Sequence, residues 1–338
     1  MYKSCCLGCG GRARGHADAY RFVKKSRLEA VCDMNTERLH PFAEKWGVPR
    51  SYTDLHEMLE TEKPDLLHIV TQPQLRVELL TAASEHGVPA VLVEKPLCLD
   101  AEDFNAIKAL GETTKTRICV NHQLRCHPKT LELLGLVRSG AIGDIRLVDG
   151  SARLGQAGQG THILNLVLAY AGGRPNRVLA QVSGGTKWMP GNHPCPDMSV
   201  AELEFDNGVR GLFSCGQNAP LTTSNPEHDH YHKRIAVYGT RGFVHWKMES
   251  WELYTPEQGY QSGEKSYRDE DVLGQAAMTD AIFEWLDDDA KPHPNRLEVS
   301  LAESNTVLGL YKSALDGAPV ALPFVPEGSL LERLRERL

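Results

Sequence analysis

The sequence has no excess of positive charge, no long hydrophobic run and no internal repeat. Its 338 residues contain 37 Lys and Arg against 44 Asp and Glu, which gives a net charge of -7 at pH 7. Since no segment is strongly basic, we expect no binding to nucleic acid or to an anionic membrane. No segment approaches the roughly 20 apolar residues of a membrane span, and the N-terminal residues lack the pattern of a signal peptide. These absences predict a cytoplasmic protein.

The cysteines do not form a disulfide framework. The chain has nine of them, an odd number at irregular spacing, which is typical of reduced cytoplasmic thiols. Cys6 and Cys9 match a C-x-x-C pattern, but they lie across a predicted buried strand and the turn after it. A metal site would need a second pair of ligands, so we assign no metal or redox site.

The composition is that of an ordinary globular protein. Hydrophobic residues make up 41% and charged residues 24%, and at roughly 150 residues per domain the length corresponds to about two domains. From residue 2 to about 122, short apolar segments alternate with amphipathic ones, which predicts α/β architecture with a doubly wound parallel sheet. The expected strands are Lys3–Leu7, Leu28–Cys32, Leu66–Val70, Ala90–Val93 and Arg117–Asn121. The first domain is therefore assigned to residues 1–122.

The pattern changes after residue 122. One more expected helix, Pro128–Ser139, is followed by β-rich segments with turn signals such as Asn207-Gly208, as in an antiparallel meander. The expected strands are Ile145–Arg153, Val178–Gly184, Met198–Phe205, Gly208–Cys215, Arg234–Gly239 and Phe243–Lys247. We predict an α+β domain over residues 123–338 with a large open, mainly antiparallel sheet, closed by two helices and a short strand.

The first predicted strand leads into a glycine-rich turn that opens a helix. The turn has the pattern G-x-G-x-x-A, in which the glycines let backbone N–H groups approach a pyrophosphate. Asp33 ends the second strand, where a carboxylate binds the ribose hydroxyls of NAD and repels the 2′-phosphate of NADP. We therefore predict a Rossmann domain that binds NAD. The expected cofactor contacts are Gly8, Gly10, Gly11, Arg12, Ala13 and Asp33.

Glu94, Lys95 and Pro96 follow the fourth expected strand. This is the edge of the sheet where ligands of doubly wound folds bind. A lysine there can hold a substrate hydroxyl by a charge-assisted hydrogen bond and stabilise the alkoxide that precedes hydride transfer. We assign Lys95 to catalysis, and Glu94 together with Lys95 to the cofactor site.

Taken together, these residues resemble the Gfo/Idh/MocA family of oxidoreductases. The matching segments are Gly8–His16, Leu66–Thr71, Val93–Leu97, Arg125 with Pro128, Gly140–Gly143, Gly239–Gly242 and Lys312–Gly317. The resemblance implies a Rossmann domain with Thr71 at the cofactor site, a second domain, and a substrate cleft between the two. It also implies NAD-linked oxidation of a secondary alcohol of a sugar, cyclitol or sugar derivative, in a homodimer or homotetramer assembled through the open sheet.

The resemblance also assigns the proton acceptor. The family carries D-x-x-x-H in its second domain, and His162 matches the histidine, so it takes the acid/base role. Gly158 stands where the family has Asp, and neither Gln156 nor Gln159 can transfer a proton at neutral pH. This departure supports an alternative, an NAD-dependent glycoside hydrolase that oxidises, eliminates, hydrates and returns the hydride. A non-catalytic nucleotide-binding regulatory protein is a third hypothesis, against which Lys95 and His162 both argue.

Further polar residues are candidates for substrate contact. They are His122, Gln123, Arg125, Gln159, Trp188 and His193. His228, His230 and His232 recur at a period of two and would share one face of an extended segment. They fit either a zinc site or, with less coincidence, a loop that contacts substrate or a neighbouring subunit.

Overall fold

The computed structural model of the protein describes residues 1–183, 193–224 and 228–338. Its contacts separate two compact units. The first unit comprises Met1–Cys98, Asp103–His127 and Asp271–Leu301. The second comprises Leu99–Glu102, Pro128–Glu270 and Ala302–Leu338. Residues 271–301 therefore fold with the N-terminal segment, although more than a hundred residues separate them in the sequence.

The first unit is built on a six-stranded sheet in the order β3-β2-β1-β4-β5-β6. All neighbouring strands are parallel. The strands are β1 (Tyr2–Leu7), β2 (Ser26–Cys32), β3 (Arg50–Tyr52), β4 (Leu66–Ile69), β5 (Ala90–Glu94) and β6 (Arg117–Asn121). This order and direction confirm the predicted Rossmann sheet.

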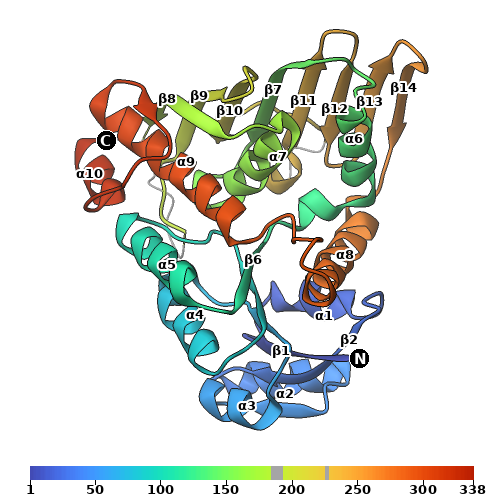
Figure 1. Cartoon of the computed structure of the whole chain (residues 1–338), viewed down its shortest axis with the longest axis vertical. Coiled ribbons are helices and arrows are strands. Elements are labelled where there is room, and N and C mark those ends of the chain that lie inside the picture. The colour runs from blue at the N-terminus through green and yellow to red at the C-terminus, as the bar shows by residue number, and fades with distance from the viewer. Residues whose placement is uncertain (184–192, 225–227) are drawn as a thin grey trace. The chain divides into compact units, whose positions relative to one another are not determined.

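Helices cover both faces of this sheet, which is why its central strands are almost continuously apolar. The helices are α1 (Ala13–Ala19), α2 (Thr36–Trp46), α3 (Leu55–Glu62), α4 (Arg76–Glu85), α5 (Ala101–Thr113) and α8 (Tyr267–Asp287). Met278, Ile282 and Phe283 of α8 pack against Leu66 and Leu92 in one buried cluster. Figure 1 shows α1 and α8 on one side of the sheet, and α4 and α5 on the other.

The second unit contains a nine-stranded sheet in the order β14-β13-β12-β11-β7-β10-β9-β8-β15. Only the β7 and β10 pair is parallel, so the sheet is mainly antiparallel, as predicted. The strands are β7 (Ile145–Ala152), β8 (Pro175–Ser183), β9 (Met198–Phe205), β10 (Arg210–Gly216), β11 (Lys233–Gly239), β12 (Phe243–Lys247), β13 (Ser250–Thr255), β14 (Gly259–Glu264) and β15 (Val320–Ala321).

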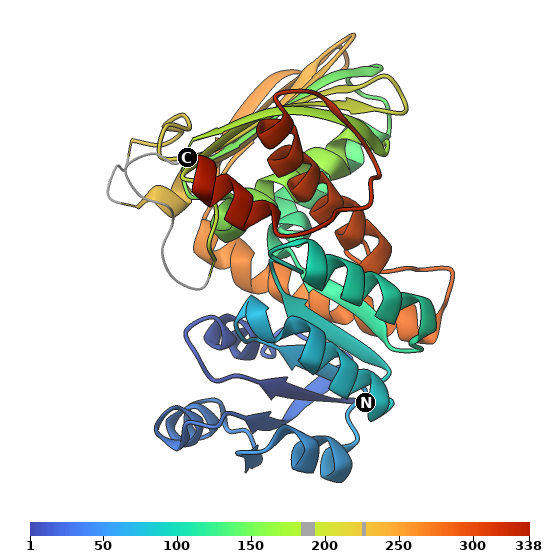
Figure 2. The same ribbon diagram turned by 90° about the vertical axis from the view of Figure 1, so that its left-hand side faces the viewer.

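Helices lie along one face of this sheet, as Figure 2 shows. They are α6 (Pro128–Arg138), α7 (Thr161–Ala171), α9 (Leu297–Asp316) and the terminal α10 (Leu330–Arg337). Short helical turns are η1 (Pro73–Leu75), η2 (Gln123–Cys126), η3 (Gln156–Gly160) and η4 (Asp229–Tyr231). No helix in the described ranges is long and apolar enough to cross a membrane.

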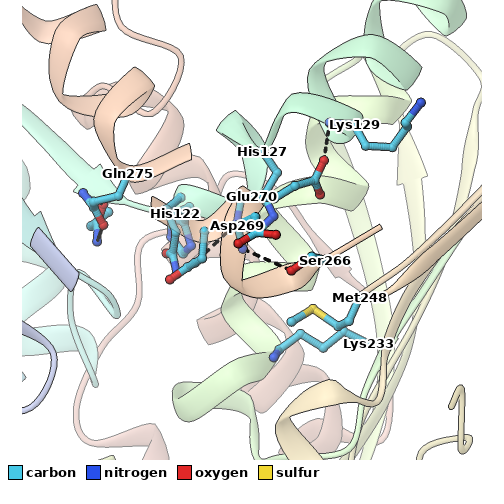
Figure 3. Close-up of polar contacts among 12 residues, drawn as sticks. His122, His127, Lys129, Lys233, Met248, Ser266, Asp269, Glu270 and Gln275 are labelled. Atoms are coloured by element: carbon cyan, nitrogen blue, oxygen red, sulfur yellow. Dashed lines mark hydrogen bonds and ion pairs between the residues drawn. The ribbon is translucent and has the colours of Figure 1, made fainter. Parts of the chain in front are cut away.

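The start of α8 is held by local polar contacts in the second unit. The backbone N–H of Lys129 donates to Glu270 at 2.8 Å, and the N–H of Asp269 donates to the Ser266 hydroxyl at 3.3 Å (Figure 3). Asp269 and Glu270 also place negative charge in the first turn, where the helix dipole favours it.

Several elements were not expected from the sequence. The three-residue β3 is mostly exposed, and β14 consists largely of polar and small residues, so neither shows an apolar alternation. The helix α10 buries only Leu330, Leu331 and Leu334. The strands β3 and β14 are held by pairing with β2 and with the adjacent β13, and α10 is held by hydrogen bonds to Asp100, none of which an apolar pattern reveals.

Gly150 generates a prediction about the packing of α7 on the sheet. A Cβ atom on Gly150 would lie 2.6 Å from Val167 Cγ2 and 2.7 Å from Ile163 Cγ2, both on α7. We expect Gly150→Ala to lower the free energy of unfolding by about 1–3 kcal/mol, because α7 must move away from β7. Chemical denaturation measures this change. The control is Gly135→Ala on α6, where a Cβ meets no atom within 4 Å and alanine favours the helix; equal destabilisation of both variants would contradict the prediction.

Candidate functional site

The glycine-rich turn lies between β1 and α1, as predicted. Gly8 has a φ of +96°, and a Cβ atom on it would collide with the carbonyl oxygen of Val70 on the way out of β4. Only glycine fits this position without strain. Gly10 and Gly11 have no atom within 4 Å of an added Cβ, so the backbone there is open to a ligand.

Asp33 follows β2 and connects the turn to the next helix. Its Oδ2 accepts the N–H of Cys9 at 2.9 Å. Its Oδ1 accepts the N–H of Asn35 at 2.9 Å and Arg38 Nη2 at 3.0 Å. The carboxylate therefore braces the glycine turn directly. The sequence analysis did not identify Arg38, although it lies five residues after Asp33 and partly balances its charge.

These residues border a pocket of about 740 Å³ in the first unit. Gly8, Gly10, Asp33, Arg38 and Thr71 all contribute to its lining. Four of them were predicted as cofactor contacts, and the structure brings those four together. The open glycine backbone and the carboxylate at the end of β2 are the features that a dinucleotide requires, so the residues present fit NAD.

Glu94 ends β5 and is nearly buried. Its Oε1 accepts Arg12 Nε at 2.9 Å, His16 Nε2 at 2.8 Å and Asn121 Nδ2 at 2.7 Å. Burial opposes ionisation, yet the Arg12 charge and the His16 hydrogen bond hold the pKa of Glu94 well below its usual value. The predicted cofactor residue Arg12 is thus already paired with Glu94, and it also donates to Gln275 at 2.8 Å.

Lys95 follows Glu94 directly. Burial lowers the pKa of Lys95, and the nearby Arg12 and Arg76 charges lower it further, while Glu94 acts in the opposite direction. An ammonium in this environment is poorly hydrated, and its hydrogen bonds to a ligand are correspondingly strong. Lys95 thus lies next to the Glu94 charge at the end of β5, and its predicted catalytic role stays a prediction.

His162 is the second residue of α7 in the second unit and is buried. The π-helical turn η3 leads into this helix. An added Cβ on Gly158 meets no atom within 4 Å, so an Asp would fit there but is missing. Gln156 is buried, and its Oε1 accepts the Cys215 thiol at 3.1 Å.

A buried carboxylate close to this turn was missed by the sequence analysis. The Cys195 thiol is hydrogen-bonded to the backbone of Gln156, Ala157 and Gly158, which places the Cys195–Asp197 segment against η3. Asp197 is 7% exposed, and its Oδ1 has no hydrogen-bond partner among the described residues. An acidic residue after a Pro-Cys-Pro sequence gives no local signal that it is buried near η3.

His122, Gln123 and Arg125 are all buried in the first unit. Gln123 Nε2 donates to Asp271 Oδ1 at 3.0 Å, and Arg125 Nη1 donates to Asn295 at 3.2 Å. Burial opposes the ionisation of Asp271, but His127 and Arg12 lower its pKa to about 2. Gln123 and Arg125 thus make hydrogen bonds within the unit, and their predicted contact with substrate stays a prediction.

The remaining candidates are less well organised. Trp188 lies outside the described residues, whereas His193 and Gln159 are partly exposed. His228, His230 and His232 do not form an extended segment, because η4 turns the chain there; His232 Nδ1 accepts the N–H of Thr222 at 3.0 Å. Within residues 1–183, 193–224 and 228–338, no three His, Cys, Asp or Glu side chains are arranged to hold a metal ion.

Comparison with known families matches both units. Residues 3–122 match the model described as "Oxidoreductase family, NAD-binding Rossmann fold". Residues 154–245 match the "GFO/IDH/MocA C-terminal domain". The two matches together cover more than half of the chain.

Individual relatives include several sugar and cyclitol dehydrogenases. D-apiose dehydrogenase of Paraburkholderia graminis is 31% identical over 142 residues, which is 42% of this chain and 38% of that protein. The chain thus aligns with about two fifths of that relative. Myo-inositol 2-dehydrogenase of Thermotoga maritima is 24% identical over 274 residues, covering 75% of this chain and 78% of the other.

Solved structures show the same fold. An oxidoreductase from Agrobacterium radiobacter in complex with NAD+, L-tartaric acid and magnesium superposes with a TM-score of 0.81 at 20% identity, covering 95% of this chain and 98% of that one. Levoglucosan dehydrogenase in complex with NADH superposes with a TM-score of 0.79 at 16% identity, over 95% and 99%.

The Asp33 geometry generates a prediction about cofactor choice. We expect the protein to bind NAD(H) more tightly than NADP(H), because the Asp33 carboxylate repels a 2′-phosphate. Asp33→Asn keeps the oxygen that braces Cys9 but removes the charge and releases Arg38, so the preference for NAD should fall by about tenfold or more. Isothermal titration calorimetry with both cofactors measures this preference. Glu78→Gln, which removes an exposed carboxylate from the same pocket, should leave the preference unchanged; tighter NADP(H) binding by the native protein would contradict the prediction.

Proposed function

Because the chain belongs to the Gfo/Idh/MocA family of NAD-binding oxidoreductases, we propose that it oxidises a secondary alcohol of a sugar, cyclitol or sugar derivative with NAD. The observation that carries this proposal is the position of Lys95, directly after the buried Glu94 charge at the carboxyl end of β5. A binding protein has no need for a partly desolvated ammonium at this edge of the sheet. The names of the relatives, which act on apiose, myo-inositol and levoglucosan, support a polyol-like substrate.

In this proposal the first unit binds the cofactor and orients the substrate. The Gly8 turn and Asp33 hold NAD, which supplies the hydride acceptor when it is bound. Lys95 donates a hydrogen bond to the reacting hydroxyl and stabilises the negative charge that develops on its oxygen. Glu94 keeps Lys95 protonated, since an unbalanced ammonium in this environment loses its proton more readily.

The second unit supplies the proton acceptor. His162 accepts the hydroxyl proton as a neutral imidazole. The carboxylate that accompanies this histidine in the family is missing at Gly158. We propose that Asp197 compensates for it, because its buried, unpartnered Oδ1 belongs to the segment that contacts the backbone of Gly158.

The proposed roles of Lys95 and His162 are tested by substitution. Lys95→Ala and His162→Ala should each lower turnover by roughly 10²-fold or more while NAD affinity stays within a few-fold of native. Steady-state rates and cofactor titration measure the two effects. Lys108→Ala, at an exposed lysine on α5, provides a control for loss of a surface amine. Near-native turnover of His162→Ala would assign the proton acceptor to another group, with His122 the first candidate.

A glycoside hydrolase that uses captive NAD is the second candidate function, and the glycine at position 158 favours it. A reaction that returns its hydride in every cycle needs no release of NADH. For this second function we expect weak NADH release with common free sugars, because the hydride is returned while the cofactor stays bound. A screen of free sugars, cyclitols and aryl glycosides that records both NADH and aglycone separates the two functions. Robust NADH production from a hexose or inositol, without cleavage of any glycoside, would establish the ordinary dehydrogenase.

The open face of the large sheet supports a homo-oligomer. The face opposite α7 exposes apolar side chains on five strands, at Leu179, Val200, Leu212, Tyr238 and Tyr254. Strand pairing aligns these positions across one face of the sheet. Such an apolar surface favours association, so we infer a homodimer or homotetramer. The nine cysteines are all buried in the described residues and form no disulfide there, which supports a cytoplasmic enzyme.

A further inference from the structure

A chain of three hydrogen bonds crosses the interior of the first unit and ends on Glu94. The Tyr20 hydroxyl lies 2.7 Å from His68 Nε2. His68 Nδ1 lies 3.0 Å from His16 Nδ1, and His16 Nε2 lies 2.8 Å from Glu94 Oε1. His68 is 0% exposed and His16 is 2% exposed. Solvent therefore cannot replace the partners of either histidine.

The donors in this hydrogen-bond chain can point in only one direction. The ionised Glu94 carboxylate can only accept, so His16 must carry its proton on Nε2 and leave Nδ1 as an acceptor. His68 must then donate from Nδ1 and accept at Nε2 from the Tyr20 hydroxyl. Burial lowers the pKa of both histidines, most strongly that of His68, so each ring is neutral and has one donor and one acceptor.

The neighbouring Asn121 amide is consistent with this direction. Asn121 Nδ2 lies 2.7 Å from Glu94 Oε1 and 3.0 Å from Gln275 Oε1. Gln275 Nε2, on α8, in turn donates to Asn121 Oδ1 at 3.0 Å; Figure 3 labels Gln275. Both amide protons of Asn121 are therefore used, and none remains for His16 Nε2, which lies 3.2 Å away. His16 Nε2 must donate rather than accept.

The fold explains why these residues meet. His16 and Tyr20 are four residues apart, so they lie on the same side of α1. His68 pairs in register with Leu92, and Glu94 lies two residues later on the same face of the sheet. Asn121 pairs directly with Glu94. The chain thus lies between α1 and one face of the Rossmann sheet.

We propose that Tyr20, His68 and His16 are positioning residues, which form a one-directional hydrogen-bond chain that keeps Glu94 ionised and fixed beside Lys95. Only the expected effect of Glu94 on Lys95 rests on the proposed function. The hydrogen-bond chain itself is a property of the first unit. None of the three residues touches the reacting atoms in this proposal; they act through Glu94.

Other charged groups also face this carboxylate, and the chain must be distinguished from them. The charged or titratable groups around Glu94 are Cys6 on β1, Arg12 in the glycine turn, His16 on α1, His68 on β4, Arg76 on α4, Lys95 after β5 and Asp271 on α8. Arg12 Nε and Asn121 Nδ2 also donate to Oε1, so loss of His16 weakens the site without removing all compensation. The expected effect is therefore a shift in titration rather than loss of folding.

The tautomers provide the first test, and it does not depend on activity. Nitrogen-15 NMR of protein with labelled histidine, assigned by substitution, should show His16 in the Nε2–H form and His68 in the Nδ1–H form at neutral pH. In Tyr20→Phe, the His68 Nε2 resonance should shift, because its donor is gone. A native His16 in the Nδ1–H form, or doubly protonated at neutral pH, would overturn the direction of the chain.

The protonation of Glu94 provides the second test. Infrared difference spectra against Glu94→Gln should show Glu94 ionised down to the lowest pH at which the native protein stays folded. In His16→Leu, Glu94 should protonate at a pH higher by about one unit or more, since a hydrogen bond to a charge is lost. His16→Gln should restore most of the native titration, because its amide can donate to Oε1.

A matched control separates this effect from general destabilisation. His293 is also buried in the first unit, where its ring bonds the backbone of Met278 and Asn295, and no described contact links it to Glu94. His293→Leu should lower the melting temperature but leave the Glu94 titration in place. An equal shift in His16→Leu and His293→Leu, or none in either, would overturn the inference.

Turnover then distinguishes the inference from the proposed function. If both hold, the acid limb of the pH profile for kcat/KM should move upward with the Glu94 titration in His16→Leu and return in His16→Gln. The tautomers and the Glu94 titration can behave as expected while the acid limb of the pH profile does not move with that titration. This result would confirm the hydrogen-bond chain and show that the proposed role of Lys95 is wrong.

Discussion

A single buried charge, the carboxylate of Glu94 at the end of β5, is the constraint on which the first unit depends. An ionised group at this depth is costly unless it is paired and hydrogen-bonded. Its three donors come from the glycine turn, from α1 and from β6. The same carboxylate oxygen therefore joins the glycine turn, α1 and β6 around one charge, directly before Lys95.

Much of the first unit could be predicted because its signals are contiguous in the sequence. The glycine turn, Asp33 and the Glu94-Lys95-Pro96 segment each combine a strand end with a chemical group within a few residues. The structure confirms the sheet and gathers Gly8, Asp33 and Thr71 around one pocket. Arg38 was missed because its significance arises only from the ion pair with Asp33.

The other contacts of the fold and the site could not be predicted, because they depend on how distant segments pack together. The link between His16 and His68 depends on the register of β4 against β5 and on the placement of α1, neither of which a linear pattern specifies. The packing of α8 against the first sheet joins segments more than two hundred residues apart, such as Leu66 and Phe283. Likewise, the position of Asp197 close to η3 could not be predicted, because it depends on the contact of Cys195 with the backbone at Gly158.

The two units place different electrostatic demands on their polar groups. In the first unit, Glu94 is held ionised by its donors, and Glu94 opposes the lowering of the Lys95 pKa by burial. In the proposed function, His162 of the second unit changes its protonation during each turnover. The absence of a carboxylate at position 158 therefore affects the proton that His162 would accept and leaves the charges of Glu94 and Lys95 unchanged. In the proposed function, that separation explains how the protein can lack the family's acidic residue and still keep Lys95, with Asp197 as the residue proposed to compensate near His162.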